Sequence, residues 1–172
     1  MKKIFALLLG LLVIPMGAKA VGIFNAESPT VEASELMEHY KQNKFAFAKD
    51  WEGRRFVVVG SVNRVDEGRL DGAFSDGPEY PKIILNGLFH AFLIDPNDNL
   101  ELANIQRQDV FAFDCSNIRG DGLYIQGVCR PALQNRTDAQ GKTQVLYLTK
   151  DPEVRKFVFS QETIEKLGPE GN

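Results

Sequence analysis

One segment constrains the fold of this chain more than any other: the run RFVVVGSVNRV from Arg55 to Val65. It is rich in β-branched residues and predicts a strand. Valines precede Gly60 at both odd and even positions, so both faces of the strand are expected to be buried. A glycine inside such a strand often marks a bulge or a sharp bend. The segment therefore predicts a bent strand that serves two layers of a small sheet structure.

Four further strands are expected downstream, separated by turn-rich segments. A long loop rich in Gly and Asp is expected from Asp66 to Pro78, and Asn86-Gly87 is a strong signal for a two-residue hairpin turn. A short helical turn is expected over Leu100–Ile105. The four strands are expected at Tyr80–Leu85, Leu88–Ile94, Val110–Cys115 and Leu123–Val128.

An amphipathic helix is expected before the first strand, because apolar residues recur there at helical spacing. Ser28 or Thr30 is the expected cap, and a break is expected near Asn43. The apolar face consists of Ala33, Leu36, Met37 and Tyr40 and continues through Phe45, Phe47, Ala48 and Trp51.

The tail beyond Pro131 differs in composition from the preceding strands, and its first part is polar. It is expected to contain a loop, then two strands that pair around Asp151-Pro152, and finally a short helix that begins at Ser160. The expected bounds are Gln134–Lys142 for the loop, Gln144–Thr149 and Val154–Phe159 for the strands, and Gln161–Leu167 for the helix.

This order of elements predicts an all-β fold with helical additions. The expected architecture is a five-stranded OB-fold barrel, preceded by an N-terminal helix and followed by a C-terminal extension. The expected division of the chain is a signal peptide at residues 1–20, the barrel with its helix at residues 21–133, and the extension at residues 134–172.

The first twenty residues have the layout of a secretory signal peptide. Lys2 and Lys3 precede an apolar run of about 13 residues, and Ala18-Lys19-Ala20 supplies small residues before the expected cleavage point. The alternative, a membrane anchor, would need roughly 20 apolar residues. The layout is of the bacterial type and predicts a periplasmic or secreted protein that begins at Val21.

Cleavage after Ala20 would remove three lysines and no acidic residue. It would leave 17 basic and 23 acidic side chains and a net charge of −6. Proteins that bind phosphate backbones usually carry an excess of basic residues. Nucleic acid is therefore not the expected partner.

Cys115 and Cys129 are the two cysteines of the chain. In an oxidising compartment an even pair predicts a disulfide, and two buried thiols are the alternative. A hairpin centred near Arg119 would place Cys129 opposite Asp109, which is too far from Cys115 for a bridge. The bond therefore requires staggered strands or a turn centred elsewhere.

The segment SELMEHYKQNKFAFAKDWEGRRFVVVGSVNRVDEG resembles the opening of the tRNA_anti-like family of exported OB-fold proteins, and DVFAFDCSNIRGDGLYIQGVC is similar to its two-cysteine closing half. The resemblance covers about Ser34 to Leu133. It implies an OB-fold and a disulfide and leaves function open. Trp51 stands where the family usually has Tyr. The matching positions are Leu36, Tyr40, Asn43, Ala48, Trp51, Gly53, Val57, Val59, Gly60 and Val62.

No motif in the sequence predicts a catalytic or metal centre. Asp95, Asn97 and Asn99 are spaced like calcium ligands, but Leu100 stands where such a loop needs glycine. Neither His39 nor His90 belongs to a recognised catalytic motif. We therefore expect no metal, no cofactor and no enzymatic activity, with a small hydrolase as the second alternative.

The leading hypothesis is an exported, non-enzymatic module that binds a protein or another partner in the cell envelope. The first alternative is a binder of single-stranded nucleic acid or oligosaccharide, because OB-folds use the face of strands two and three for these ligands. Tyr80 and Lys82 share a face of one strand, as do His90 and Phe92 of the next. The candidate residues are Arg64, Tyr80, Lys82, His90 and Phe92, and the competing interpretation is that the aromatic ones face the core.

Overall fold

The computed structural model describes residues 29–70, 76–95 and 100–159. The expected signal peptide at residues 1–20, Ser28 and the expected helix Gln161–Leu167 lie outside the described residues.

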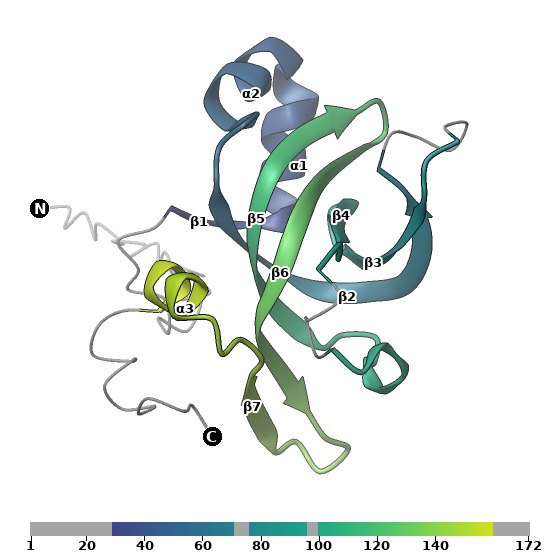
Figure 1. Cartoon of the computed structure of the whole chain (residues 1–172), viewed down its shortest axis with the longest axis vertical. Coiled ribbons are helices and arrows are strands. Elements are labelled where there is room, and N and C mark those ends of the chain that lie inside the picture. The colour runs from purple at the N-terminus through teal and green to yellow at the C-terminus, as the bar shows by residue number, and fades with distance from the viewer. Residues whose placement is uncertain (1–28, 71–75, 96–99, 160–172) are drawn as a thin grey trace, which may run out of the picture.

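The described part of the chain contains seven strands, three α-helices and one short 3-10 helix (Figure 1). In chain order they are β1 (Thr30–Glu32), α1 (Ala33–Gln42), α2 (Lys44–Trp51), β2 (Phe56–Arg69), β3 (Glu79–Leu85), β4 (Phe89–Phe92), the 3-10 helix (Leu102–Asn104), β5 (Val110–Asp121), β6 (Tyr124–Thr137), β7 (Thr143–Tyr147) and α3 (Pro152–Val158).

Five of these strands form a closed ring, which gives a barrel-like, mainly β fold with helical additions. β2 pairs antiparallel with both β3 and β5. β3 pairs antiparallel with β4, β4 pairs parallel with β6, and β6 pairs antiparallel with β5. The other two strands extend the sheet: β1 lies parallel to β2, and β7 lies antiparallel to β6.

β2 changes partner near its middle, as the predicted bent strand requires. Its first half, to Ser61, pairs with β5, and its second half pairs with β3. The register shifts between Val62 and Arg64, so the irregularity lies beyond Gly60. A Cβ on Gly60 would lie 3.1 Å from the Cβ of Ala33 and 3.1 Å from a methyl of Leu85. Gly60 therefore serves close packing rather than the bend.

Two boundaries near the N-terminal half differ from the expectation. β2 continues to Arg69, because residues 66–69 pair with β3, so the start of the expected loop is strand. Thr30 lies in β1 and is not the helix cap, because α1 begins at Ala33 and its N-cap residue is Glu32. The predicted break is confirmed: the Asn43 side chain accepts hydrogen bonds from the first turn of α2.

The β5–β6 hairpin explains how the two cysteines meet. Its turn lies at Gly122-Leu123, since Asp121 pairs with Tyr124. Together with a register shift after Ser116, this turn brings Cys115 directly opposite Cys129, with 4.1 Å between their Cα atoms. The disulfide is formed, and the expectation that it requires staggered strands or a turn centred away from Arg119 is confirmed.

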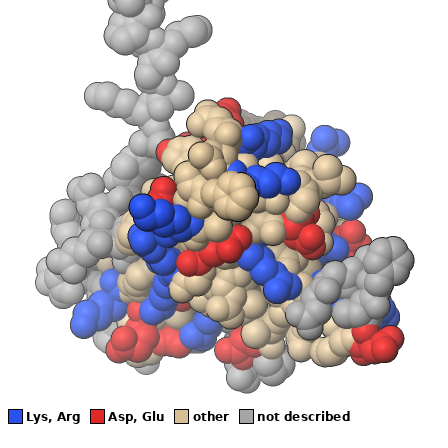
Figure 2. Space-filling model, turned by 90° about the horizontal axis from the view of Figure 1, so that it is seen from above, with Lys and Arg blue, Asp and Glu red and all other residues tan. Residues whose placement is uncertain are grey.

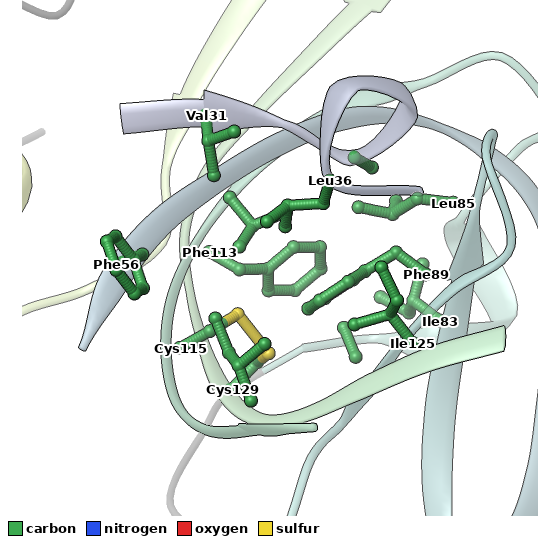
Figure 3. Packing of buried hydrophobic residues seen from close by; sticks show 14 of the residues in the cluster. Val31, Leu36, Phe56, Ile83, Leu85, Phe89, Phe113, Cys115, Ile125 and Cys129 are labelled. Atoms are coloured by element: carbon green, nitrogen blue, oxygen red, sulfur yellow. A yellow bond between two sulfur atoms is a disulfide. The ribbon is translucent and has the colours of Figure 1, made fainter. Parts of the chain in front are cut away.

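The interior of the ring is filled by aromatic and aliphatic side chains around this disulfide (Figure 3). α1 and α2 contribute the predicted apolar face, including Leu36, Tyr40 and Phe47. A Cβ on Gly120 of β5 would lie 2.1 Å from the Tyr40 ring, so the absence of a side chain there lets α1 pack against β5. None of the helices in the described ranges has the length and apolar character of a membrane span.

The C-terminal segment corrects two expectations. Gln134–Thr137 belong to β6, because all four pair with β7 and the first two also pair with β5, so only the rest of the expected polar loop remains. The expected strand Val154–Phe159 is wrong. Asp151 caps α3 by accepting a hydrogen bond from the Glu153 N–H at 2.8 Å, and proline at the first helical position favours this start.

α3 covers the outside of the ring rather than adding to it (Figure 1). Val154, Val158 and the adjacent Phe159 pack against Val57 of β2 and Ala112 of β5. Val58, the next residue of β2, faces the interior cluster. The prediction that both faces of this strand are buried is therefore confirmed, and α3 buries the outer one.

Candidate ligand-binding pocket

The outer face of β3 and β4 carries several of the candidate residues. Ile83 of β3 and Ala91 of β4 belong to the interior cluster. Because strand side chains alternate between faces, Lys82, His90 and Phe92 lie on the opposite side of the sheet, which we call the outer face. Lys82 is directly opposite Phe92 in the register of β3 and β4.

A hollow of about 330 Å³ lies on this outer face. We call it the aromatic pocket. Lys82, His90 and Phe92 form part of its wall, and Tyr124 at the start of β6 completes that part. The end of β2 and the start of β3 supply the remaining lining residues, which are Glu67, Gly68, Arg69 and Glu79.

His90 and Tyr124 are stacked, with 4.1 Å between ring centroids and 10° between ring planes. The Tyr124 hydroxyl donates a hydrogen bond to Asp121 at 2.7 Å, which fixes the position of the ring. The Lys82 ammonium lies 5.6 Å from the centre of the Phe92 ring, within cation–π distance. The pocket thus combines aromatic surfaces with one ammonium group.

The two stacked rings are uncharged at neutral pH. Burial, followed by the positive charges of Lys82 and Arg64, lowers the pKa of His90 from 6.5 to about 4. Burial and the hydrogen bond to Asp121 raise the pKa of Tyr124 to about 12. Neither ring therefore gains or loses a proton near pH 7. General acid–base catalysis is most efficient when the pKa of the catalytic group lies near the working pH.

A second set of charges borders the pocket. Arg69 and Glu79 form an ion pair with 3.4 Å between nitrogen and oxygen, and Glu67 also lines the hollow. A Cβ on Gly68 would lie 2.4 Å from the Lys82 nitrogen, so the glycine leaves space for the ammonium group. Carboxylate acceptors and cationic donors therefore meet within one small volume.

The five candidate residues are brought together only in part. Lys82, His90 and Phe92 line the aromatic pocket. Arg64 lies beside it, mostly exposed and paired with Asp66 at 3.5 Å. Tyr80 is opposite Gly68 in the register but does not line the pocket. Phe92 is buried, as the competing interpretation expects, yet it lies outside the interior cluster.

Five lining residues are not among the sequence candidates, and Tyr124 is the aromatic one of them. It lies within the expected strand Leu123–Val128, so its presence in a strand could be predicted. Its contact with His90 depends on the parallel pairing of β4 with β6, in which His90 is opposite Gln126. Nothing in the local pattern indicates that register.

Comparison of the chain with protein-family models, with curated proteins and with solved structures found no match.

Proposed function

We propose that the protein is an exported, non-enzymatic binding module of the OB-fold type that binds an oligosaccharide of the cell envelope. The observation that carries the proposal is the aromatic pocket. Its stacked His90 and Tyr124 lie beside Lys82 and two carboxylates on the outer face of the barrel-like ring.

The order of strands around the ring supports the OB-fold part of this proposal. β2, β3, β4, β5 and β6 close a five-membered ring whose connections are those expected for a small Greek-key barrel. OB-folds bind ligands on the face of their second and third strands. β3 and β4 hold these positions in the ring, and the pocket lies on them. The resemblance to the tRNA_anti-like family supports the same assignment.

The lining of the pocket supports a sugar as the ligand. A sugar ring has an apolar face that can pack on an aromatic side chain, and hydroxyl groups around its edge that donate and accept hydrogen bonds. Tyr124 offers the aromatic surface, Glu67 and Glu79 offer acceptors, and Lys82 offers a donor. A neutral or weakly charged ligand suits this mixture of charges.

The distribution of charge argues against a phosphate backbone. Lysine and arginine side chains alternate with aspartate and glutamate on the face seen in Figure 2, without a continuous basic stripe. Acidic side chains also line the aromatic pocket itself. A phosphodiester chain would meet repulsion there as well as attraction.

Export is the part of the proposal that concerns location. The disulfide between Cys115 and Cys129 is compatible with an oxidising compartment outside the cytoplasm. Cleavage of the signal peptide after Ala20 would deliver the mature chain to the periplasm or to the medium.

Calorimetric titration with β-1,4-linked N-acetylglucosamine oligomers tests the proposal. These oligomers combine hydroxyl groups with apolar ring faces and acetamide groups. Substitution of Tyr124 by Ala is expected to weaken binding about tenfold, since an aromatic stacking contact contributes about 1.5 kcal/mol. Phe45→Ala is the matched control, because Phe45 is 90% exposed and does not line the pocket. An unchanged affinity of Tyr124→Ala, or the absence of binding by the wild-type protein, would contradict the proposal.

A second candidate function, binding of a protein partner, is favoured by the edge of β7. Within the described ranges β7 pairs with β6 alone, and its Val145 and Leu146 are exposed. Such an edge can accept a further strand from another protein. An envelope protein captured by the wild-type chain and lost with Val145→Lys would support this function. Equal capture by both baits would exclude it.

A further inference from the structure

A second hollow lies on the same outer face as the aromatic pocket. It has a volume of about 400 Å³ and combines the polar side chains of Glu52, Asn117 and Arg119 with the apolar ones of Leu70, Ile118 and Val128. Its lining comes from β5, β6 and the segments next to β2, whereas the aromatic pocket lies mainly over β3 and β4.

The register of the sheet connects the two hollows. Phe92 of the aromatic pocket is opposite Val128 on β6, which lines the second hollow. In the neighbouring row, His90 is opposite Gln126, which is opposite Arg119 on β5. The two hollows are thus displaced from each other by two strand spacings, a distance of roughly 10 Å.

An irregularity in β5 shapes the second hollow. The register with β6 shifts between Ser116 and Arg119, and Asn117 has a φ of 51° within this shift. Asparagine adopts this left-handed conformation more readily than most residues. Ile118 is buried in the interior cluster, whereas Asn117 is exposed at the hollow. β-bulges that redirect a side chain occur often beside binding and active sites.

Gln126 lies between the two hollows and provides an independent observation. Its side chain is 1% exposed, and its Nε2 donates a hydrogen bond to the carbonyl of Leu70 at 2.8 Å. Its Oε1 is buried and has no hydrogen-bond partner among the residues that the structure describes. Buried acceptors are nearly always paired, so an unpaired one suggests a donor supplied by a ligand or an ordered water.

We propose that the two hollows are neighbouring subsites for one elongated ligand, a chain of at least three N-acetylated hexose units, so that a dimer occupies only one of them. The chemical class of the ligand rests on the proposed function. One unit packs on Tyr124 in the aromatic pocket. A unit further along the same chain lies over β5, where the Asn117 amide and the Glu52 carboxylate bind its polar edge and Val128 contacts the acetamide methyl.

The inference predicts that affinity depends on ligand length. We expect the hexamer of β-1,4-linked N-acetylglucosamine to bind the wild-type protein at least about tenfold more tightly than the dimer, since only the longer chain reaches both subsites. Calorimetric titration of both oligomers gives the ratio directly. Equal affinities for dimer and hexamer would overturn the inference.

Asn117→Gly separates the two subsites, because glycine retains the positive φ while the amide is lost. The variant is expected to bind the hexamer about five- to tenfold more weakly and the dimer unchanged. Glu52→Gln, which retains the shape of the side chain, is expected to act in the same direction. Tyr124→Ala should weaken the binding of both oligomers, and Phe45→Ala should weaken neither.

The outcomes distinguish this inference from the proposed function. If Tyr124→Ala weakens binding but Asn117→Gly and Glu52→Gln do not affect the hexamer, the proposed function stands and the second subsite is wrong. If neither oligomer binds the wild-type protein, both are wrong. The second subsite is supported if the affinity no longer depends on ligand length in Asn117→Gly and Glu52→Gln but still does so in the other variants.

Discussion

At His90, burial and nearby positive charges both lower the pKa of the ring. The ring is half-buried against Tyr124, and Lys82 and Arg64 lie close enough to oppose a further positive charge. Asp66 and Asp121 raise the pKa of His90, but by less than burial and the two cations lower it. The ring is therefore neutral in the folded protein at pH values where a free histidine is partly protonated.

His90 should titrate with a midpoint of about 4, and Lys82→Met should raise its pKa while burial keeps it below 6.5. A lowered histidine pKa means that the unfolded chain binds the proton more readily. The stability of the fold should therefore decrease as the pH falls from about 6.5 towards 4. An NMR titration of the His90 ring in the wild type and in Lys82→Met measures the effect. A midpoint near 6.5 in the wild type would contradict it.

Asp109 is a second residue whose environment predicts a measurable effect. Its carboxylate is 3% exposed and accepts hydrogen bonds from Arg136 at 2.8 Å and Gln134 at 2.7 Å. Burial alone would raise the pKa of Asp109, but the bonds from Arg136, the Gln106 N–H and Gln134 outweigh burial and lower it. These contacts connect the start of β5 with the end of β6.

Asp109→Asn should destabilise the fold by about 2–3 kcal/mol, because hydrogen bonds to a charged group are lost in a buried place. Because the carboxyl pKa of Asp109 is lower in the folded protein, the ionised group stabilises the fold at pH values above the pKa of the unfolded chain, near 3.8. This contribution disappears as the pH falls through the pKa of the folded protein. The difference between variant and wild type should therefore shrink in acid. Denaturant unfolding at pH 7 and pH 3 tests this, with the exposed Asp50→Asn as control. A pH-independent difference would argue against the ionic contribution.

Among the elements, the sequence pattern predicts the features that depend on neighbouring residues. The run of valines in β2 predicted burial of both faces, and α3 supplies the outer cover. Val154 and Val158 have helical spacing, yet the apolar run around them also fits a strand, and Asp151 fits a turn as well as a helix cap. Short apolar runs do not separate these two states by composition alone.

The position of the turn between β5 and β6 could not be predicted from the sequence either. Gly120, Asp121 and Gly122 all favour a turn, but the register of β5 and β6 is fixed by long-range packing. Gly120 is needed where it contacts Tyr40, and Gly122 has the positive φ of the turn. Only the folded sheet distinguishes these two roles of glycine.

Gly120→Ala tests the contact between α1 and β5. A Cβ there would lie 2.1 Å from the Tyr40 ring, so the helix or the strand must move. We expect a loss of about 1–3 kcal/mol, the usual cost of overpacking a core. In a Tyr40→Ala background the same substitution should cost much less. Thermal unfolding of the wild type, the two single variants and the double variant measures this coupling. An equal loss of stability from Gly120→Ala in both backgrounds would disprove the contact.

At the scale of the whole molecule, three of the five candidate residues could be predicted because alternation in strands defines shared faces. Lys82, His90 and Phe92 lie on the outer face for that reason, and they line one pocket. Tyr124 and Asn117 could not be predicted. The first depends on a parallel pairing between distant strands, and the second on a bulge that no local signal marks.

The overall charge predicts weak binding of nucleic acid. The mature chain would carry a net charge of −6, so single-stranded DNA should bind no more tightly than about 10⁻⁴–10⁻⁶ M at ~150 mM salt, the range of non-specific contacts. Fluorescence anisotropy with a labelled oligo-dT gives the dissociation constant. Nanomolar affinity at that salt concentration would favour nucleic acid over a sugar as the ligand.

We propose above that the outer face of β3 and β4 binds a sugar chain through the aromatic pocket. The most direct measurement is a titration of the ¹⁵N-labelled mature protein with the β-1,4-linked N-acetylglucosamine hexamer, followed by amide chemical shifts. We predict that the largest shifts occur at Lys82, His90 and Tyr124, residues that line the pocket. Shifts concentrated elsewhere, for example at Val145 and Leu146 of β7, or no shifts at millimolar hexamer, would contradict the claim.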